Sequence, residues 1–428
     1  MGLGPASQGI ATVVYWVIRL HIRIGLLLAV QLAAFQFLPN VTLGAEPEER
    51  SRSNQSAVHQ RIAPVPRDAA RARPVPRVEP AHLPQTTLSA VSAKEIEDGL
   101  REFGANWLGP TRLVSGVSGS GSTSSAPGLI LGRWSRHGPR SVWRAALRSV
   151  GAKALRVRFS GFDVDGEVYL YAGRGADIGP YTGLGPQNDG DFWTDIVLSD
   201  SVTIEYVLPS GAVALTAGPP FRVTAVAHII RPLVADGRAD SRLGMFSPLG
   251  PLPRAIAGCH LDASCYPEWQ DRRYPSIALV HTVTNQGGHQ CTGTLINPRF
   301  ETDEHLLMLT AGHCIEDQDQ AQNAVFIWGY QTTECYGQAS SRRHRRTTGS
   351  TLLAHQNDEE GDFALLRLRE RDVLSVTGAT SLGWTTGWVS EYTPVVAVSH
   401  PAGSFKRVAF GHFEDPNWLS PTWYTGIR

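Results

Sequence analysis

A histidine beside a cysteine marks the stretch of sequence best suited to chemistry. Cys291 and Cys314 bracket two apolar runs joined by a polar stretch, and His313 immediately precedes the second cysteine. This pattern predicts a hairpin closed by a disulfide, with the histidine held at its exit. A general base must keep a fixed ring orientation relative to its partners, and a covalent tie beside it restricts that orientation. The alternative is a structural histidine beside a structural disulfide.

One carboxylate follows at a position from which it could assist His313. Asp362 lies 49 residues further along, directly before the apolar run Phe363–Leu368, which is typical of a buried strand. An aspartate at such a junction can accept a hydrogen bond from the imidazole, fix its tautomer and stabilise the imidazolium. The alternative is an aspartate that only caps the strand.

The two motifs resemble those of the trypsin-like serine proteases. Thr-Ala-Gly-His-Cys at 310–314 is similar to the run that carries the catalytic histidine of that family, and Gly-Asp-Phe-Ala-Leu-Leu at 361–366 to the run that carries its aspartate. Residues 255–428 resemble the bacterial lysyl-endopeptidase-like branch more closely, in the runs at 258–265, 291–296, 326–331 and 399–403. The resemblance implies that His313 is the base and Asp362 its orienting partner. It implies no metal and no organic cofactor.

All five cysteines, Cys259, Cys265, Cys291, Cys314 and Cys335, lie after residue 258. Their spacing does not repeat a paired short motif, which disfavours zinc ligation. The resemblance implies that Cys291 pairs with Cys314 and Cys265 with Cys335, and that Cys259 pairs with a cysteine that is not in this chain. An odd count leaves one thiol unpaired.

The nucleophile that the resemblance implies is missing from the sequence. The serine of the family sits in a glycine-rich turn whose backbone amides form the oxyanion hole, and no such run occurs between residues 363 and 428. Ser404 and Ser420 lack the flanking glycines. We therefore expect a protease domain that is truncated at its C-terminus, and no proteolysis at triad rates from residues 1–428 alone.

Composition and length are those of a globular protein with two or three domains, since 42% of the 428 residues are hydrophobic and 18% charged.

The first 45 residues contain a basic region, the mostly apolar run 24–38 and small residues before Glu46. They predict a signal peptide, or alternatively a signal anchor. The run is short for a membrane span, so we expect no stable span after leader removal and a secreted, periplasmic or extracellular protein.

The remaining boundaries follow from changes in composition. We expect a disordered Pro/Arg/Ser/Gly-rich linker at 46–127, a β-sandwich at 128–235, a second linker at 236–258 and a trypsin-like protease domain at 259–428. The fold class is therefore all-β. A sandwich that looks like the jelly-roll-like region of some secreted relatives precedes a chymotrypsin-like double β-barrel, which is incomplete in its second barrel.

The charge distribution is uneven although the formal net charge is zero. Residues 46–160 hold 18 Lys or Arg against 9 Asp or Glu, and residues 259–428 hold 13 against 19. No patch interleaves arginine with aromatic residues as nucleic-acid binders do. We therefore expect no nucleic-acid partner, and the resemblance to serine proteases implies protein or peptide substrates.

The sequence thus predicts a secreted serine endopeptidase that acts by acyl transfer. The main alternative is a catalytically inactive protease homologue that serves as an extracellular binding module. A second alternative assigns binding to the sandwich, where Trp193 and Tyr181 are the only support for an aromatic platform. The sequence does not determine which residue the enzyme would prefer before the cleaved bond.

Overall fold

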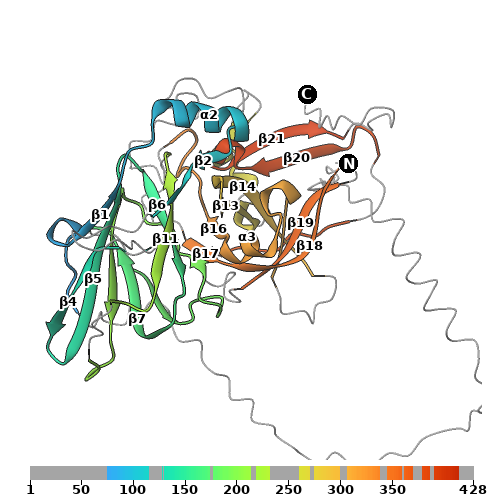
Figure 1. The fold of residues 1–428 in the computed structure, drawn as a ribbon. Coiled ribbons are helices and arrows are strands. Elements are labelled where there is room, and N and C mark those ends of the chain that lie inside the picture. The colour runs from blue at the N-terminus through green and yellow to red at the C-terminus, as the bar shows by residue number, and fades with distance from the viewer. Residues whose placement is uncertain are drawn as a thin grey trace, which may run out of the picture. The chain divides into compact units, whose positions relative to one another are not determined.

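Short apolar runs fold as strands through most of the chain, and few helices interrupt them (Figure 1). The computed structural model describes residues 75–114, 128, 130–173, 177–213, 218–231, 260–269, 274–298, 306–337, 345–358, 361–369, 378–385 and 390–413. Contacts divide the chain into two units, residues 18–76 and the remainder, and everything described below belongs to the second. The predicted leader, the second linker and Cys259 lie outside the described residues.

Two sheets face each other across a common core in the first part of the described chain. The six-stranded sheet has the order β1-β5-β10-β7-β8, with β4 also paired to β5. Its strands are β1 (Gln85–Leu88), β4 (Gly132–His137), β5 (Arg140–Ser149), β7 (Val164–Tyr171), β8 (Ile178–Gly183) and β10 (Ser201–Val207). The four-stranded sheet has the order β3-β11-β6-β9, with β3 (Thr111–Leu113), β6 (Ala154–Ser160), β9 (Phe192–Trp193) and β11 (Arg222–Ile229).

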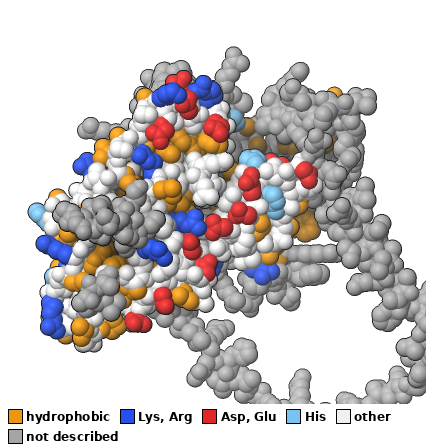
Figure 2. Space-filling model, viewed as in Figure 1, with side chains coloured by type: hydrophobic (Ala, Val, Ile, Leu, Met, Phe, Trp, Pro, Cys, Tyr) orange, Lys and Arg blue, Asp and Glu red, His pale blue; other side chains and the backbone are white. Residues whose placement is uncertain are grey.

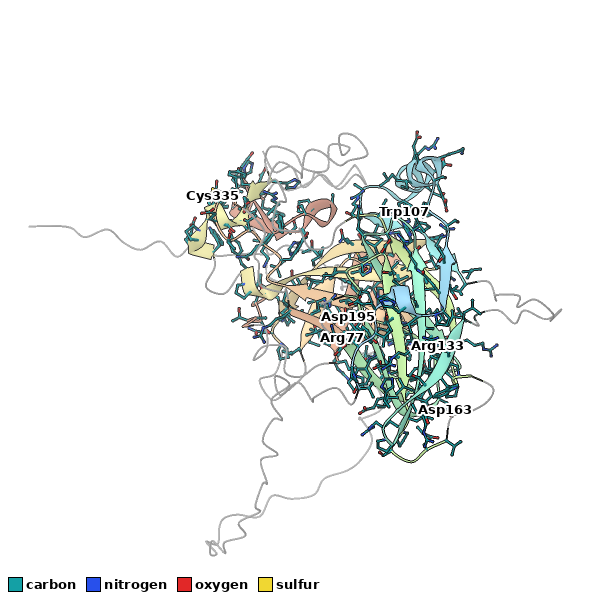
Figure 3. All side chains as sticks on the ribbon, turned by 90° about the vertical axis from the view of Figure 1, so that its left-hand side faces the viewer. Arg77, Trp107, Arg133, Asp163, Asp195 and Cys335 are labelled. Carbon is teal, nitrogen blue, oxygen red and sulfur yellow. A yellow bond between two sulfur atoms is a disulfide. The ribbon has the colours of Figure 1, made fainter. Side chains whose placement is uncertain are left out.

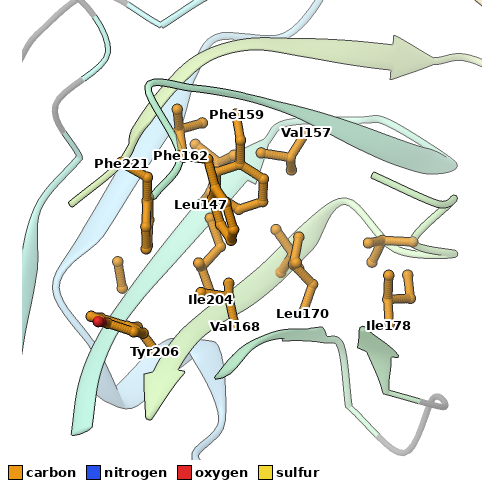
Figure 4. Close-up of a cluster of buried hydrophobic side chains, with 14 of the residues drawn as sticks. Leu147, Val157, Phe159, Phe162, Val168, Leu170, Ile178, Ile204, Tyr206 and Phe221 are labelled. Atoms are coloured by element: carbon orange, nitrogen blue, oxygen red, sulfur yellow. The ribbon is translucent and has the colours of Figure 1, made fainter. Parts of the chain in front are cut away.

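Alternation along these strands directs one row of side chains into the shared core. The core includes Leu147 and Ile204 of the larger sheet and Val157 and Phe159 of the smaller one. Figure 4 shows these side chains packed with further aromatic rings, among them Phe162 and Phe221 at a ring-centroid distance of 5.6 Å. The two sheets therefore share one hydrophobic core, and we refer to them together as the sandwich.

Part of the stretch predicted to be a disordered linker is in fact structured, so that prediction is wrong for residues 80–113. A 3₁₀ turn, η1 (Pro80–His82), leads into β1, which pairs in parallel with β5. Helix α2 (Ala93–Phe103) follows and begins with a capping box between Ser92 and Glu95. Composition missed the strands of this stretch because their order comes from backbone pairing with distant strands and from two buried residues, Trp107 and Leu108.

The second part of the chain contains an eight-stranded and a three-stranded sheet. The larger has the order β17-β16-β13-β14-β15-β19-β18, with β2 added to β14. Its strands are β2 (Trp107–Gly109), β13 (Ile277–Thr284), β14 (Gly287–Ile296), β15 (Leu307–Thr310), β16 (Val325–Trp328), β17 (Arg345–Thr348), β18 (Ser350–Asp358) and β19 (Gly361–Leu368). The smaller sheet contains β12 (Leu261–Asp262), β20 (Pro394–Ser399) and β21 (Arg407–His412).

Short helical elements connect these strands. They are α3 (Gln318–Asn323) and the 3₁₀ turns η3 (Ala263–Cys265), η4 (Pro267–Trp269), η5 (Tyr274–Ser276), η6 (Gly312–Cys314) and η7 (Pro401–Gly403). The all-β prediction is therefore confirmed. The jelly-roll arrangement, the closure of the barrels and the domain boundaries beyond the linker remain predictions. None of the helices found among the described residues combines the length and the apolar composition of a membrane-spanning segment.

Strand β13 is buried on both faces, because the sandwich covers the face that points away from the core of its own sheet. Ala278 and Val280 point into that core. Leu279, on the opposite face, packs in a cluster with Ala154, Ile196 and Ile229 of the sandwich and with Ile327 of β16. The aspartate near this contact, Asp195, and Trp107 of β2 are labelled in Figure 3.

Polar contacts reinforce this apolar contact. Arg346 of β17 donates to the carbonyl of Ile196 at 2.7 Å and pairs with Asp195 at 3.3 Å. Thr111 donates through its hydroxyl to the carbonyl of Thr284 at 2.7 Å. The sandwich and the eight-stranded sheet thus share buried side chains, hydrogen bonds and one added strand.

A fully buried lysine joins the two sheets of the second part. Lys406 donates through Nζ to the carbonyl of Tyr274, and its backbone N–H donates to Tyr330 at 2.9 Å. Burial lowers the pKa of Lys406 to about 7 from a usual 10.5 because the interior disfavours the ammonium form. This lysine therefore titrates in the folded protein well below its range in an unfolded chain.

We predict that Lys406 makes the free energy of unfolding increase as the pH rises above 7. The unfolded chain binds more protons at this site between pH 7 and 10.5, so the folded protein should gain stability relative to Lys406→Met across that window, by on the order of 5 kcal/mol at most. Urea unfolding of both proteins at pH 6, 7, 8, 9 and 10 measures the difference. The two curves should run in parallel below pH 7, and parallel curves across the whole range would contradict the prediction.

Candidate active site

His313 lies in a single tight turn between a strand and a short helix. Strand β15 ends at Thr310, η6 spans Gly312–Cys314, and α3 begins at Gln318. Thr310 donates through its hydroxyl to the carbonyl of Thr292 on the neighbouring β14 at 2.8 Å, which fixes the end of the strand. The His313 side chain is 55% exposed, so its ring is open to solvent while its backbone is held.

Asp362 contacts His313 twice. Its Oδ1 accepts the backbone N–H of His313 at 2.9 Å, and its Oδ2 lies 2.7 Å from His313 Nδ1. Two contacts from one carboxylate determine both the position of the residue and the direction of its ring. With Nδ1–H donating to Asp362, the other ring nitrogen, Nε2, carries the lone pair that a general base needs.

Sheet pairing brings these two residues together although 49 residues separate them. β15 pairs antiparallel with β19, so Thr310 lies opposite Ala364, two residues beyond Asp362. The strand register therefore places Asp362 beside the turn that follows β15. The structure brings together the two residues singled out in the sequence, and their catalytic role remains a prediction.

Gly312 allows the turn to lie directly against β18 and β19. A Cβ at this position would lie 2.0 Å from the carbonyl oxygen of Gln356 and 3.1 Å from the backbone nitrogen of Phe363. The carbonyl of Gly312 faces Nε2 of His355 at 3.2 Å. Sequence reasoning did not single out His355, because only the packing of β18 against the turn reveals its contact.

Both disulfides implied by the resemblance are present. Cys291 of β14 is joined to Cys314, which directly follows the histidine, and Cys265 is joined to Cys335. Cys335 is labelled in Figure 3. The first bond ties the His313 turn to the central strand of its sheet. It restricts the backbone on the side of the histidine that Asp362 does not hold.

These cysteines do not form a metal site with His313. Donor atoms of Cys291, His313 and Cys314 lie within 4.8 Å of one another, and no other such cluster occurs among the described residues. Both sulfur atoms are bonded to each other, so neither is free as a thiolate ligand.

Three other described histidines, His228, His281 and His400, are buried, and burial lowers the pKa of two of them far below the usual 6.5. Burial lowers the pKa of His281 to about 3, and its Nδ1 donates to the carbonyl of His289 at 3.0 Å. Burial likewise lowers the pKa of His228 to about 4, and its Nδ1 contacts the hydroxyl of Ser149 at 2.7 Å. Both stay neutral and enclosed, so neither can exchange protons with a substrate.

Several carboxylates lie close to His313 in the sequence, and its own side chain is exposed. Glu316, Asp317 and Asp319 follow it in the chain, and Asp358 lies at the end of β18. Figure 2 shows histidine side chains beside carboxylates on the face it presents.

Ser404 lies after η7, where its hydroxyl donates to the carbonyl of Phe405 at 3.0 Å, and Ser420 lies outside the described residues.

Comparisons with known proteins match the same part of the chain. Residues 255–422 match the family described as "Lysyl endopeptidase, C-terminal domain". The chain is 29% identical over 287 residues to a lysyl endopeptidase of Pseudomonas aeruginosa, an alignment that covers 64% of this chain and 58% of the relative. The resemblance to the lysyl-endopeptidase branch is therefore confirmed, and the chain spans a little over half of that relative.

Two solved structures are also similar to part of this chain. One is the thermostable serine protease AL20 from an extremophilic microorganism, at 20% identity and a TM-score of 0.27, covering 35% of this chain and 70% of that one. The other is the protease Anisep from Arthrobacter nicotinovorans, at 16% identity and a TM-score of 0.24, covering 34% and 66%. Similarity at this level carries no conclusion about the fold or the activity.

We predict that Gly312→Ala destabilises the protein and displaces His313. The added methyl cannot fit 2.0 Å from the Gln356 oxygen, so the turn must move away from β18 and β19. We expect a loss of about 1–3 kcal/mol in urea unfolding and faster amide exchange at His313. Gly383→Ala is the control, because a Cβ there has no atom within 4 Å. Equal effects of the two substitutions would contradict the prediction.

Proposed function

We propose that this protein is a serine endopeptidase in which His313 is the general base and Asp362 orients it. The observation that supports this most strongly is the double contact of Asp362 with the backbone and ring of His313. It lies in the segment that matches the lysyl endopeptidase family. A strand-capping aspartate would need only the backbone contact, so the contact with the ring favours a catalytic role.

The proposed chemistry is acyl transfer. Nε2 of His313 takes the proton of a serine hydroxyl as its oxygen attacks the scissile carbonyl, and Asp362 stabilises the resulting imidazolium through Nδ1–H. The imidazolium then protonates the leaving amine, so the peptide C–N bond breaks and an acyl-enzyme forms. A water molecule, deprotonated by the same nitrogen, hydrolyses the ester and restores the serine. We assign no residue as the nucleophile.

Substrate class and compartment belong to the same proposal. The His313 side chain is exposed rather than enclosed in a cavity, which suits an extended peptide substrate. Two disulfides favour an oxidising compartment, in keeping with a secreted, periplasmic or extracellular enzyme. The name of the Pseudomonas aeruginosa relative makes cleavage after lysine the first specificity to test.

The test uses the protein expressed from its gene through to the natural stop codon. We expect labelling by a fluorophosphonate and hydrolysis of a lysyl peptide anilide. Asp362→Asn should lower kcat about 10⁴-fold, because the imidazole loses its correct tautomer. His313→Ala should lower it at least as far.

His82→Ala is the matched control, since this exposed histidine lies in η1 of the sandwich and should leave kcat unchanged. Activity that survives His313→Ala would overturn the proposed role of His313. A folded product that is neither labelled nor active would overturn the enzyme proposal and favour the inactive binding module.

A further inference from the structure

Helix α3 is capped by residues of the sandwich and not only by its own chain. The last carbonyls of a helix lack partners within the helix and carry its partial negative charge. Here Nη2 of Arg156 donates to the carbonyl of Asn323 at 2.6 Å, and Nε2 of Gln187 donates to the carbonyl of Gln322 at 3.1 Å. A cation and an amide from β6 and the β8–β9 loop thus complete the end of this helix.

The side chain of Asn323 is held from the same direction. Its Oδ1 accepts the backbone N–H of Trp193 at 2.8 Å and Nε2 of Gln187 at 2.8 Å. Its Nδ2 donates back to the carbonyl of Asp319 at 2.9 Å, within α3. Asn323 is 4% exposed, so these bonds are formed away from water, where losing one costs more than at the surface.

Arg156 is suited to this contact because it is fixed at both ends of its guanidinium. Its Nε donates to the carbonyl of Thr194 at 2.7 Å. Burial lowers its pKa to about 10, so it remains charged at neutral pH. A planar guanidinium held by one carbonyl presents its second donor in a fixed direction.

The other end of α3 leads directly to His313. Asp317 caps the helix by accepting the backbone N–H of Gln320 at 2.7 Å, and the side chain of Gln320 accepts the N–H of Glu316 at 3.0 Å. Ile315, between this cap and Cys314, is buried in the core of the sheet. No flexible spacer therefore separates α3 from the histidine turn.

The same helix is also bonded to β18, which pairs with the strand of Asp362. Gln318 accepts the N–H of Leu352 at 2.9 Å, and the hydroxyl of Ser350 donates to the carbonyl of Ala321 at 2.7 Å. Asp362 lies opposite Asn357 of β18. The position of α3 therefore links the segment of His313 to the strand pair that carries Asp362.

We propose that Arg156 and Gln187 of the sandwich are positioning residues, which hold the His313 turn in register with Asp362 by capping α3 at Gln322 and Asn323. This rests on the proposed role of His313 for its catalytic meaning. The sandwich then contributes to the geometry of the site, because its residues hold α3 and α3 holds the His313 turn. Neither residue touches the substrate.

The experiment measures the His313–Asp362 contact itself, so its result does not depend on whether the protein is a protease. Amide exchange at His313 and the proton NMR signal of its Nδ1–H are followed in the 428-residue chain. Asp362→Asn is the reference for complete loss of the contact between the Asp362 carboxylate and His313. In Gln187→Ala and in Arg156→Met we expect His313 exchange to become about tenfold faster, with a weakened Nδ1–H signal.

Arg346→Met is the matched control. It removes another arginine that bonds a sandwich carbonyl across the same contact, but one that does not touch α3. It should leave the exchange rate and the Nδ1–H signal of His313 unchanged. Gln187 is only half-buried, so Gln187→Ala decides the result if Arg156→Met does not fold.

Unchanged exchange and signal in a folded Gln187→Ala protein would overturn the proposal. Equal acceleration in Arg346→Met would also overturn it, because the effect would then reflect general loosening of the contact between the sandwich and the sheet. A protein that shows the expected exchange but no proteolysis would sustain the positioning role and refute only the enzyme proposal.

Discussion

One carboxylate contacts both the backbone and the ring of one histidine, and several features of the fold serve to maintain this double contact. Asp362 can hold His313 in this way only if the turn after β15 lies against β19. The missing side chain of Gly312 permits that approach, and the disulfide from Cys314 maintains it on the other side. Each of these features acts on backbone position, which is what a general base with a fixed ring requires.

Burial of β13 on both faces explains why the sandwich cannot be regarded as a separate attachment. A strand in an antiparallel sheet normally turns one face to water, yet Leu279 and Ile327 are covered by residues of β6 and β11 and of the segment after β9. Removing the sandwich would expose these apolar side chains. It would also remove the donors that cap α3, so packing and the geometry of the site are linked through one surface.

Four buried cations among the described residues show how the protein tolerates charge in its interior. Arg144 pairs with the buried carboxylate of Glu205 at 2.7 Å and Arg407 with that of Asp262 at 3.6 Å, whereas Arg156 and Lys406 donate to backbone carbonyls. The two arginines with carboxylate partners are neutralised directly. Burial lowers the pKa of the other two cations, and the effect is large enough to bring the pKa of Lys406 to about 7. Carbonyl-bound cations therefore join elements of the fold at a cost in stability.

The all-β class, the two candidate residues and, through family resemblance, both disulfides could be predicted from the amino-acid sequence, because these depend on local alternation and short motifs. The sequence could not show that residues 80–113 are structured, since their order comes from pairing β1 with β5 and β2 with β14. Nor could it single out Arg156, Gln187 and His355, each of which contacts a backbone carbonyl far along the chain, because such a carbonyl carries no sequence signature. Strand register and sheet packing set the distances between these side chains and the carbonyls, so their contacts become visible only in the folded protein.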